Sequence, residues 1–140
     1  MSQTQQNLLK AFAGESQARN KYLSFAKVAR KEGHEWIARI FEATADNERA
    51  RAEELLELIN VPETVSGTLE IAPTSTKTTD NLKTAAAGEK FEWTNMYPDF
   101  EKVAKDEGEA EAERLFGRLK EVEEDHEEIL YFITCTYNQA

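Results

Sequence analysis

Glu123 and His126 are spaced as two ligands on one face of a helix. Apolar residues around them recur at intervals of three and four positions, and both residues fall on this stripe, which runs Ala112, Phe116, Leu119, Glu123, His126, Leu130 and Ile133. An ionised glutamate on a buried stripe is costly unless a partner compensates for its charge. A metal ion is one such partner, because carboxylate oxygen and imidazole nitrogen both bind iron and manganese.

Four predicted helices each carry a glutamate on such a stripe. The helices cover residues 4–33, 35–60, 80–107 and 109–136, with Thr4 and either Thr79 or Asp80 as the expected N-caps. The five glutamates on these stripes are Glu15, Glu48, Glu89, Glu92 and Glu123. Antiparallel packing would bring them to one level, where five buried carboxylates would repel one another strongly without bound metal. The pattern therefore predicts a di-metal carboxylate site that includes His126.

The two halves of the sequence repeat. Tyr22 recurs 75 residues later as Tyr97, and at the same offset Glu48 matches Glu123 and Arg51 matches His126. Upstream, Gly14-Glu15 matches Gly88-Glu89 at an offset of 74. One extra residue therefore lies between Glu89 and Tyr97, and a single insertion within a helix predicts a π-bulge.

A long connection joins the two halves. Residues 61–79 contain Pro62, Gly67, Pro73 and a run of serine and threonine, and they are too many for a tight turn between antiparallel neighbours. Two helix hairpins, 4–60 and 80–137, joined by a crossover over 61–79, predict an all-α, ferritin-like four-helix bundle. We expect residues 1–140 to form a single domain.

Composition narrows the classes of partner. The formal net charge of −10 argues against nucleic acid and anionic membranes. No apolar run reaches the ~18 residues of a membrane span, and no secretory signal is visible at the N-terminus. The single cysteine, Cys135, cannot form an internal disulfide, which fits a reducing compartment. We expect a cytoplasmic protein.

Five motifs resemble the di-iron domain of the rubrerythrin family over about residues 5–135. They are Phe12-Ala-Gly-Glu-Ser-Gln-Ala-Arg19, Ala45-Asp-Asn-Glu48, Ala87-Gly-Glu-Lys-Phe-Glu92, Asn95-Met-Tyr-Pro98 and Glu123-Glu-Asp-His126. The resemblance implies a ferritin-like fold, two non-haem iron ions, which manganese or zinc could replace, and reduction of hydrogen peroxide to water in oxidative-stress defence.

The resemblance also implies roles for single residues. The residues that match the family's metal ligands are Glu15, Glu48, Glu89, Glu92, Glu123 and His126. Glu48 and Glu123 match the bridging carboxylates. Tyr22 and Tyr97 match tyrosines that hydrogen-bond ligand carboxylates, although both could equally be ordinary core aromatics.

Partners follow from the same resemblance. With one cysteine, the sequence lacks the paired Cys-x-x-Cys motifs of a rubredoxin domain, so it resembles the shorter erythrin members. Electrons would come from another protein, such as a rubredoxin or an NAD(P)H-linked reductase. The family implies a homodimer, and the long crossover would permit exchange of helices between chains.

Arg51 departs from the family pattern, which has histidine at this position. Arginine keeps its proton and cannot coordinate a cation. Arg51 could pair with a carboxylate and leave Glu92 permanently bound to metal, or it could turn to solvent while water fills the coordination position. Its charge could also exclude one cation. One alternative to a peroxidase is an oxygen-reactive di-iron or di-manganese oxidase or ferroxidase. The other, which follows from Arg51 in place of the expected histidine, is a non-catalytic metal-binding bundle.

Overall fold

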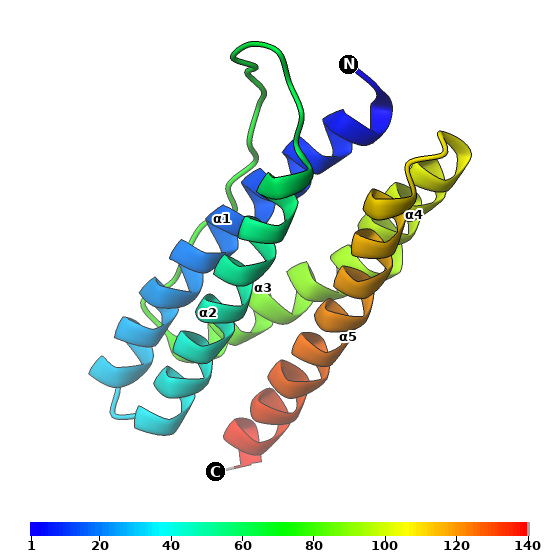
Figure 1. The fold of residues 1–140 in the computed structure, drawn as a ribbon. Coiled ribbons are helices and arrows are strands. Elements are labelled where there is room, and N and C mark those ends of the chain that lie inside the picture. Colours follow the sequence, from blue (N-terminus) through cyan, green and yellow to red (C-terminus); the bar gives the residue numbers. More distant parts are fainter. Residues whose placement is uncertain (140) are drawn as a thin grey trace.

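The computed structural model describes residues 1–139, with side chains as far as residue 137, and its long helices form an all-α bundle (Figure 1). The elements in chain order are α1 (Gln3–Lys31), α2 (Glu35–Leu58), α3 (Thr78–Phe91), η1 (Glu92–Met96), α4 (Tyr97–Asp106) and α5 (Ala110–Gln139). Because α3, η1 and α4 follow one another without a break, they form the third of four helical rods. The predicted four-helix bundle is confirmed.

Two helix hairpins make up the bundle. α1 turns into α2 through Gly33, and α4 turns into α5 through Gly108; both glycines have positive φ, at 86° and 73°. The backbone N–H that follows each glycine donates to a carbonyl in the last turn of the preceding helix. At the first turn, His34 N donates to the Ala29 carbonyl at 2.8 Å. Glycine adopts this left-handed conformation without the penalty that other residues carry, which explains its place at both turns.

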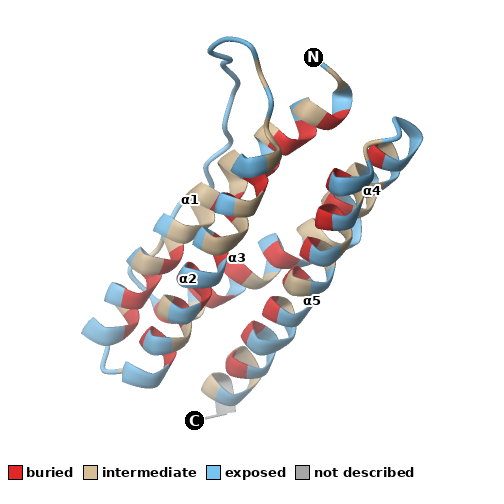
Figure 2. Ribbon diagram, viewed as in Figure 1, coloured by how far each residue is buried: buried red, intermediate tan, exposed pale blue. Residues whose placement is uncertain are grey.

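The faces that the helices turn toward one another are buried (Figure 2). Their apolar residues form two hydrophobic clusters, one toward each end of the bundle. One cluster contains Phe25, Phe41 and Leu130, and the other contains Leu8, Leu55 and Phe116. Along α1, α2, α5 and the continuous rod of α3, η1 and α4, the stripe glutamates fall between the stretch that enters one cluster and the stretch that enters the other. Apolar packing on both sides therefore holds four helices around a charged middle layer.

The predicted helix starts at Thr4 and residue 80 are wrong by one or two residues. Ser2 is the N-cap of α1, and its hydroxyl accepts from Gln5 N at 3.1 Å. α3 begins at Thr78, so neither Thr79 nor Asp80 caps it. Thr4 and Thr78 instead donate backbone N–H groups to side chains of the other hairpin, at 2.7 Å to Glu107 and 2.6 Å to Glu32. Both threonine hydroxyls donate to the same carboxylates.

The predicted π-bulge is confirmed as η1. Its wider turn absorbs the extra residue that the repeat revealed between Glu89 and Tyr97. Pro98 follows two residues after the end of η1, in the first turn of α4. A proline ring is tolerated there because its missing N–H would have little to bond at the start of a helical segment. The irregular turn of η1 thus lies just before Pro98.

The crossover between α2 and α3 runs beyond the end of α2 and then back along α1 (Figure 1). Two α1 side chains hold it: Gln17 Nε2 donates to the Glu70 carbonyl at 2.9 Å, and Lys21 Nζ to the Ala72 carbonyl at 3.1 Å. Over the described residues, none of the helices combines the length and apolar character needed to cross a membrane.

Candidate metal centre

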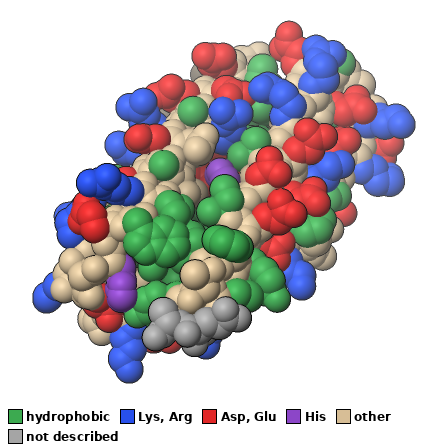
Figure 3. All heavy atoms as spheres, turned by 90° about the horizontal axis from the view of Figure 1, so that it is seen from below, with side chains coloured by type: hydrophobic (Ala, Val, Ile, Leu, Met, Phe, Trp, Pro, Cys, Tyr) green, Lys and Arg blue, Asp and Glu red, His purple; other side chains and the backbone are tan. Residues whose placement is uncertain are grey.

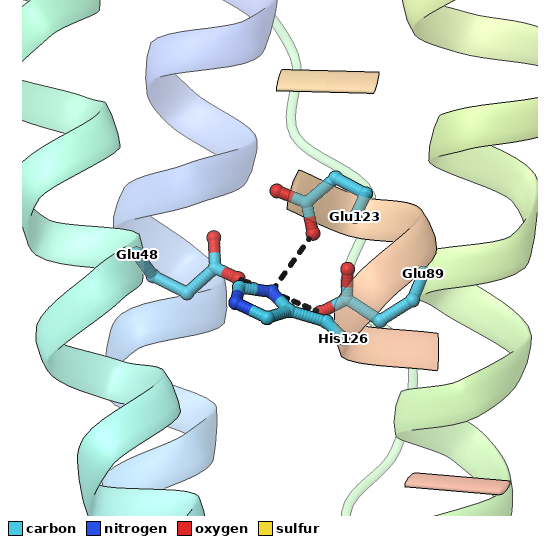
Figure 4. A group of neighbouring side chains, drawn as sticks. All are labelled: Glu48, Glu89, Glu123 and His126. Carbon is cyan, nitrogen blue, oxygen red and sulfur yellow. Dashed lines mark hydrogen bonds and ion pairs between the residues drawn. The ribbon is translucent and has the colours of Figure 1, made fainter. Parts of the chain in front are cut away.

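Three glutamates from three different helices surround His126 (Figure 4). His126 Nδ1 lies 3.2 Å from Glu48 Oε1, 3.3 Å from Glu123 Oε2 and 3.7 Å from Glu89 Oε1. One ligand atom from each of the four residues lies within 4.8 Å of the others, and all four residues are buried. Three carboxylates and one imidazole at this spacing can surround a single cation.

A second group of carboxylates adjoins the first. Glu15, Glu92 and Glu123 also offer oxygens within 4.8 Å of one another. Glu123 belongs to both groups, whereas Glu48 belongs to the first. All six residues singled out in the sequence therefore lie together, in two groups with one shared carboxylate.

Several buried carboxylate oxygens are left without a hydrogen-bond partner in the part of the chain that the structure describes. They are Glu15 Oε2, both Glu48 oxygens, Glu89 Oε2 and Glu123 Oε1. A buried acceptor without a partner is costly, and an anionic one is more so. Oxygen ligands with one imidazole suit iron or manganese, so the residues present fit a pair of such ions.

Protons compensate for these charges when no metal is bound. Burial, aided by the charge of Glu123, raises the pKa of Glu48 to about 7, against the opposing effects of His126 and Arg51. Burial likewise raises the pKa of Glu92 to about 8. Burial disfavours the charged form of His126, but the neighbouring carboxylates of Glu123 and Glu48 outweigh this and raise its pKa to about 10. Metal binding must displace these protons.

Tyr22 and Tyr97 connect the two hairpins at the centre. Tyr22 Oη donates to Glu89 Oε1, and Tyr97 Oη donates to Glu15 Oε1, each at 2.5 Å. Each tyrosine thus bonds the glutamate of the other hairpin. Burial, with the charge of Glu92 added, raises both tyrosine pKa values well above their usual range, so both hydroxyls keep their protons and remain donors.

Arg51 pairs with a carboxylate outside the cluster. Its Nη1 lies 3.2 Å from Glu54 Oε1, and Arg118 Nη2 lies 3.1 Å from the other oxygen of Glu54. The arginine is held between cluster and solvent, because its side chain is 22% exposed while its Nε is buried and has no partner among the described residues. Sequence reasoning did not identify Glu54 as the partner, although its spacing three residues after Arg51 is typical of helical ion pairs.

Known proteins resemble both the sequence and the fold. The family model described as rubrerythrin matches residues 6–132. A rubrerythrin of Porphyromonas gingivalis is 43% identical over 131 residues, which cover 90% of this chain and 63% of that protein. A solved nigerythrin structure described as fully reduced and all ferrous covers 100% of this chain and 70% of its own, with 36% identity and a TM-score of 0.88.

A more distant structure supports the fold alone. A Rhodobacter capsulatus bacterioferritin superposes with a TM-score of 0.80 at 17% identity, which makes the bundle ferritin-like. The chain spans less than two thirds of the length of the Porphyromonas relative. The sequence identity over nine tenths of the chain and the family match nevertheless agree, and the chain belongs to the rubrerythrin family.

Proposed function

We propose that the chain is a non-haem di-iron peroxidase that reduces hydrogen peroxide to water. The observation that carries this proposal is the pair of ligand groups sharing Glu123, whose buried oxygens lack partners among the described residues. Iron is supported by the nigerythrin structure described as all ferrous. We assign Glu15, Glu48, Glu89, Glu92, Glu123 and His126 as the residues that would hold the ions. Glu123 belongs to both ligand groups, whereas a bridging role for Glu48 rests on the family resemblance alone.

Two ferrous ions held by these residues would supply the two electrons that cleavage of the O–O bond requires. Reduction of one hydrogen peroxide to two waters also takes two protons. The residues of this chain fix the geometry and exclude bulk water from one side, since Glu48 and Glu123 are fully buried whereas Glu92 is only partly so. The oxidant would therefore approach from the side of Glu92.

Tyr22 and Tyr97 keep the ligand carboxylates in place. Each hydroxyl directs its proton at one oxygen of Glu89 or Glu15, which leaves the second oxygen of that carboxylate for metal. Hydrogen bonds of this kind orient a ligand and tune its basicity. We assign both tyrosines as positioning residues.

We propose that electrons reach the centre from another protein, such as a rubredoxin or an NAD(P)H-linked reductase, and that the chain works in the cytoplasm as a homodimer. One face of the molecule gathers hydrophobic side chains between charged ones (Figure 3). Large hydrophobic side chains that are exposed in the single chain include Trp36, Tyr131 and Phe132. Exposed apolar area supports an interface with a second protein surface.

Metal analysis and single-turnover kinetics test this proposal. The chain is loaded with Fe(II) without oxygen, its iron content is measured, and its absorbance is followed after mixing with one equivalent of hydrogen peroxide or of oxygen. We expect two iron ions per chain and oxidation by peroxide that is much faster than oxidation by oxygen. The matched control is His126→Ala, which should retain less iron.

Other outcomes favour the alternative functions. Oxidation by oxygen as fast as by peroxide would favour an oxidase or ferroxidase. Retention of less than about one iron per chain, with no spectral change on adding iron, would favour a non-catalytic metal-binding bundle.

A further inference from the structure

A pocket of about 470 Å³ lies between α1 and α3, beneath residues 69–72 of the crossover. Its inner end is formed by Tyr22, Glu89 and Glu92, which belong to the metal centre or hydrogen-bond to it. Lys10 lines it as well and is exposed to solvent. The pocket therefore connects the surface with the partly exposed side of the centre.

Two glycines keep this pocket open. Gly14 and Gly88 both line it, and each directly precedes a ligand glutamate. A Cβ built on either residue would meet nothing within 4 Å across the described structure, the neighbouring backbone of its own helix aside. A glycine inside a helix costs about 1 kcal/mol relative to alanine, and here close packing does not account for it. What both glycines provide is space.

The wall of the pocket is mostly apolar, in contrast to its inner end. Ala18 and Phe25 of α1, Ala85 of α3, Met96 of η1 and Leu69 of the crossover contribute to it. Hydrogen peroxide has two heavy atoms and no apolar part. This open pocket of about 470 Å³ is far larger than that substrate requires. Its size and lining are those of a site for a small organic molecule.

We propose that this pocket binds a small organic hydroperoxide, with the alkyl or aryl group against the apolar wall and the peroxide group toward Glu89 and Glu92. The inference rests on the proposed peroxidase function and adds a substrate class to it. The reaction is ROOH + 2e⁻ + 2H⁺ → ROH + H₂O. The O–O bond breaks, and a ferrous pair held at the centre would supply the two electrons. Water at the open pocket would supply the two protons, one completing the alcohol and one the water.

The crossover forms the outer wall of this site. Within residues 69–72, Gln17 and Lys21 of α1 hold the chain through the carbonyls of Glu70 and Ala72. Leu69 lines the pocket while about half of its surface is exposed. Two side-chain hydrogen bonds therefore hold this segment over the pocket.

Binding is tested without any redox chemistry. The chain contains two methionines, and Met96 lines the pocket while Met1 lies at the exposed N-terminus. The full chain is loaded with zinc, which is redox-inert, and labelled at the methionine methyl groups. It is then titrated with cumyl alcohol, the product of cumene hydroperoxide. We expect a saturable NMR shift of the Met96 methyl, an unmoved Met1 methyl, and loss of the shift in Gly88→Leu. A stationary Met96 methyl, or the same shift in Gly88→Leu, would overturn the proposal.

Substrate selection is tested on the iron-loaded chain. We expect the ratio of kcat/KM for cumene hydroperoxide to that for hydrogen peroxide to fall about tenfold or more in Gly14→Leu and in Gly88→Leu, since added methyl groups would fill the pocket. The matched control is Ala13→Leu, on the same helix but outside the pocket, which should leave the ratio unchanged. An unchanged ratio in both glycine variants would refute the assignment.

The two proposals fail in different ways. A wild-type chain that reduces hydrogen peroxide but not cumene hydroperoxide would overturn the organic substrate and leave the peroxidase standing. A chain that reduces neither would overturn the peroxidase, whereas the Met96 titration would still report whether the pocket binds an organic molecule.

Discussion

Replacing Arg51 by histidine tests whether the centre lacks one ligand. By the internal repeat, Arg51 occupies the position that corresponds to His126, one helical turn after Glu48. In the structure its guanidinium lies against Glu54 at 3.2 Å and contributes no ligand atom to either group of the cluster. Arg51→His would place an imidazole beside the group of Glu15 and Glu92.

The cost of this change to the metal-free fold is small. The ion pair with Glu54 is partly exposed and contributes about 0–1 kcal/mol. Removing the buried Nε, which lacks a partner among the described residues, relieves a penalty of about 1–3 kcal/mol. These effects oppose each other, so the free energy of unfolding without metal should stay unchanged or rise by up to about 3 kcal/mol.

The gain in metal affinity should be larger. Changes in the groups around a metal typically alter affinity tenfold to a hundredfold, and an added ligand should raise it by at least about tenfold, or roughly 1.4 kcal/mol. The assay is a competitive titration of the second metal equivalent against a chromophoric chelator, with zinc and then with Fe(II). The melting temperature of the loaded protein should rise in parallel.

Arg51→Gln is the matched control, because it removes the charge and keeps a polar chain but adds no imidazole. If glutamine strengthens binding as much as histidine does, the effect of Arg51 is electrostatic and no ligand is missing. If histidine leaves the affinity of the second metal unchanged, position 51 does not face the centre, and the reasoning from the repeat is refuted.

Three further predictions concern the centre. The pKa values of Glu48, Glu92 and His126 are raised to about 7, 8 and 10, so the metal-free folded chain binds more protons than the unfolded chain. The melting temperature of the metal-free chain should therefore fall as the pH rises from about 5 to 9. A melting temperature that rises over this range would contradict the prediction. Tyr97→Phe leaves Glu15 Oε1 without its donor and should lower the free energy of unfolding in urea by about 1–3 kcal/mol; an unchanged midpoint would show that the bond is not needed. His126→Ala should remove one metal ion per chain and lower the melting temperature of the loaded form more than that of the metal-free form; equal losses would indicate a packing role alone.

Helical periodicity made much of the fold and the cluster predictable. Because a helix repeats every 3.6 residues, the stripe that buries Phe116 and Leu119 also buries Glu123 and His126, and a glutamate on it is conspicuous. The same regularity made a single inserted residue visible, which located η1 before the structure was known. These features are local and need no knowledge of how the helices cross.

Features that depend on tertiary placement were not predictable. The spacing of Tyr22 from Glu15 points to its own helix, yet its hydroxyl reaches Glu89 of the other hairpin. The cap expected at Thr4 was wrong, because the distant Glu107 takes both of its donors. Arg51 points toward Glu54, which also pairs with Arg118 of α5. Helical periodicity alone does not tell which of several nearby carboxylates an arginine will pair with.

The contacts of Thr4 with Glu107 and of Thr78 with Glu32 are two copies of one interaction, related by the internal repeat. Each hairpin therefore carries both the donor and the acceptor, so two identical hairpins could satisfy each other as separate molecules with twofold symmetry. In such a symmetric pair, positions 51 and 126 would be the same position of one hairpin sequence. A substitution of its histidine would therefore appear in both copies at once. Joining the hairpins in one polypeptide removes that constraint. Covalent linkage is what allows the two halves of this centre to become chemically different.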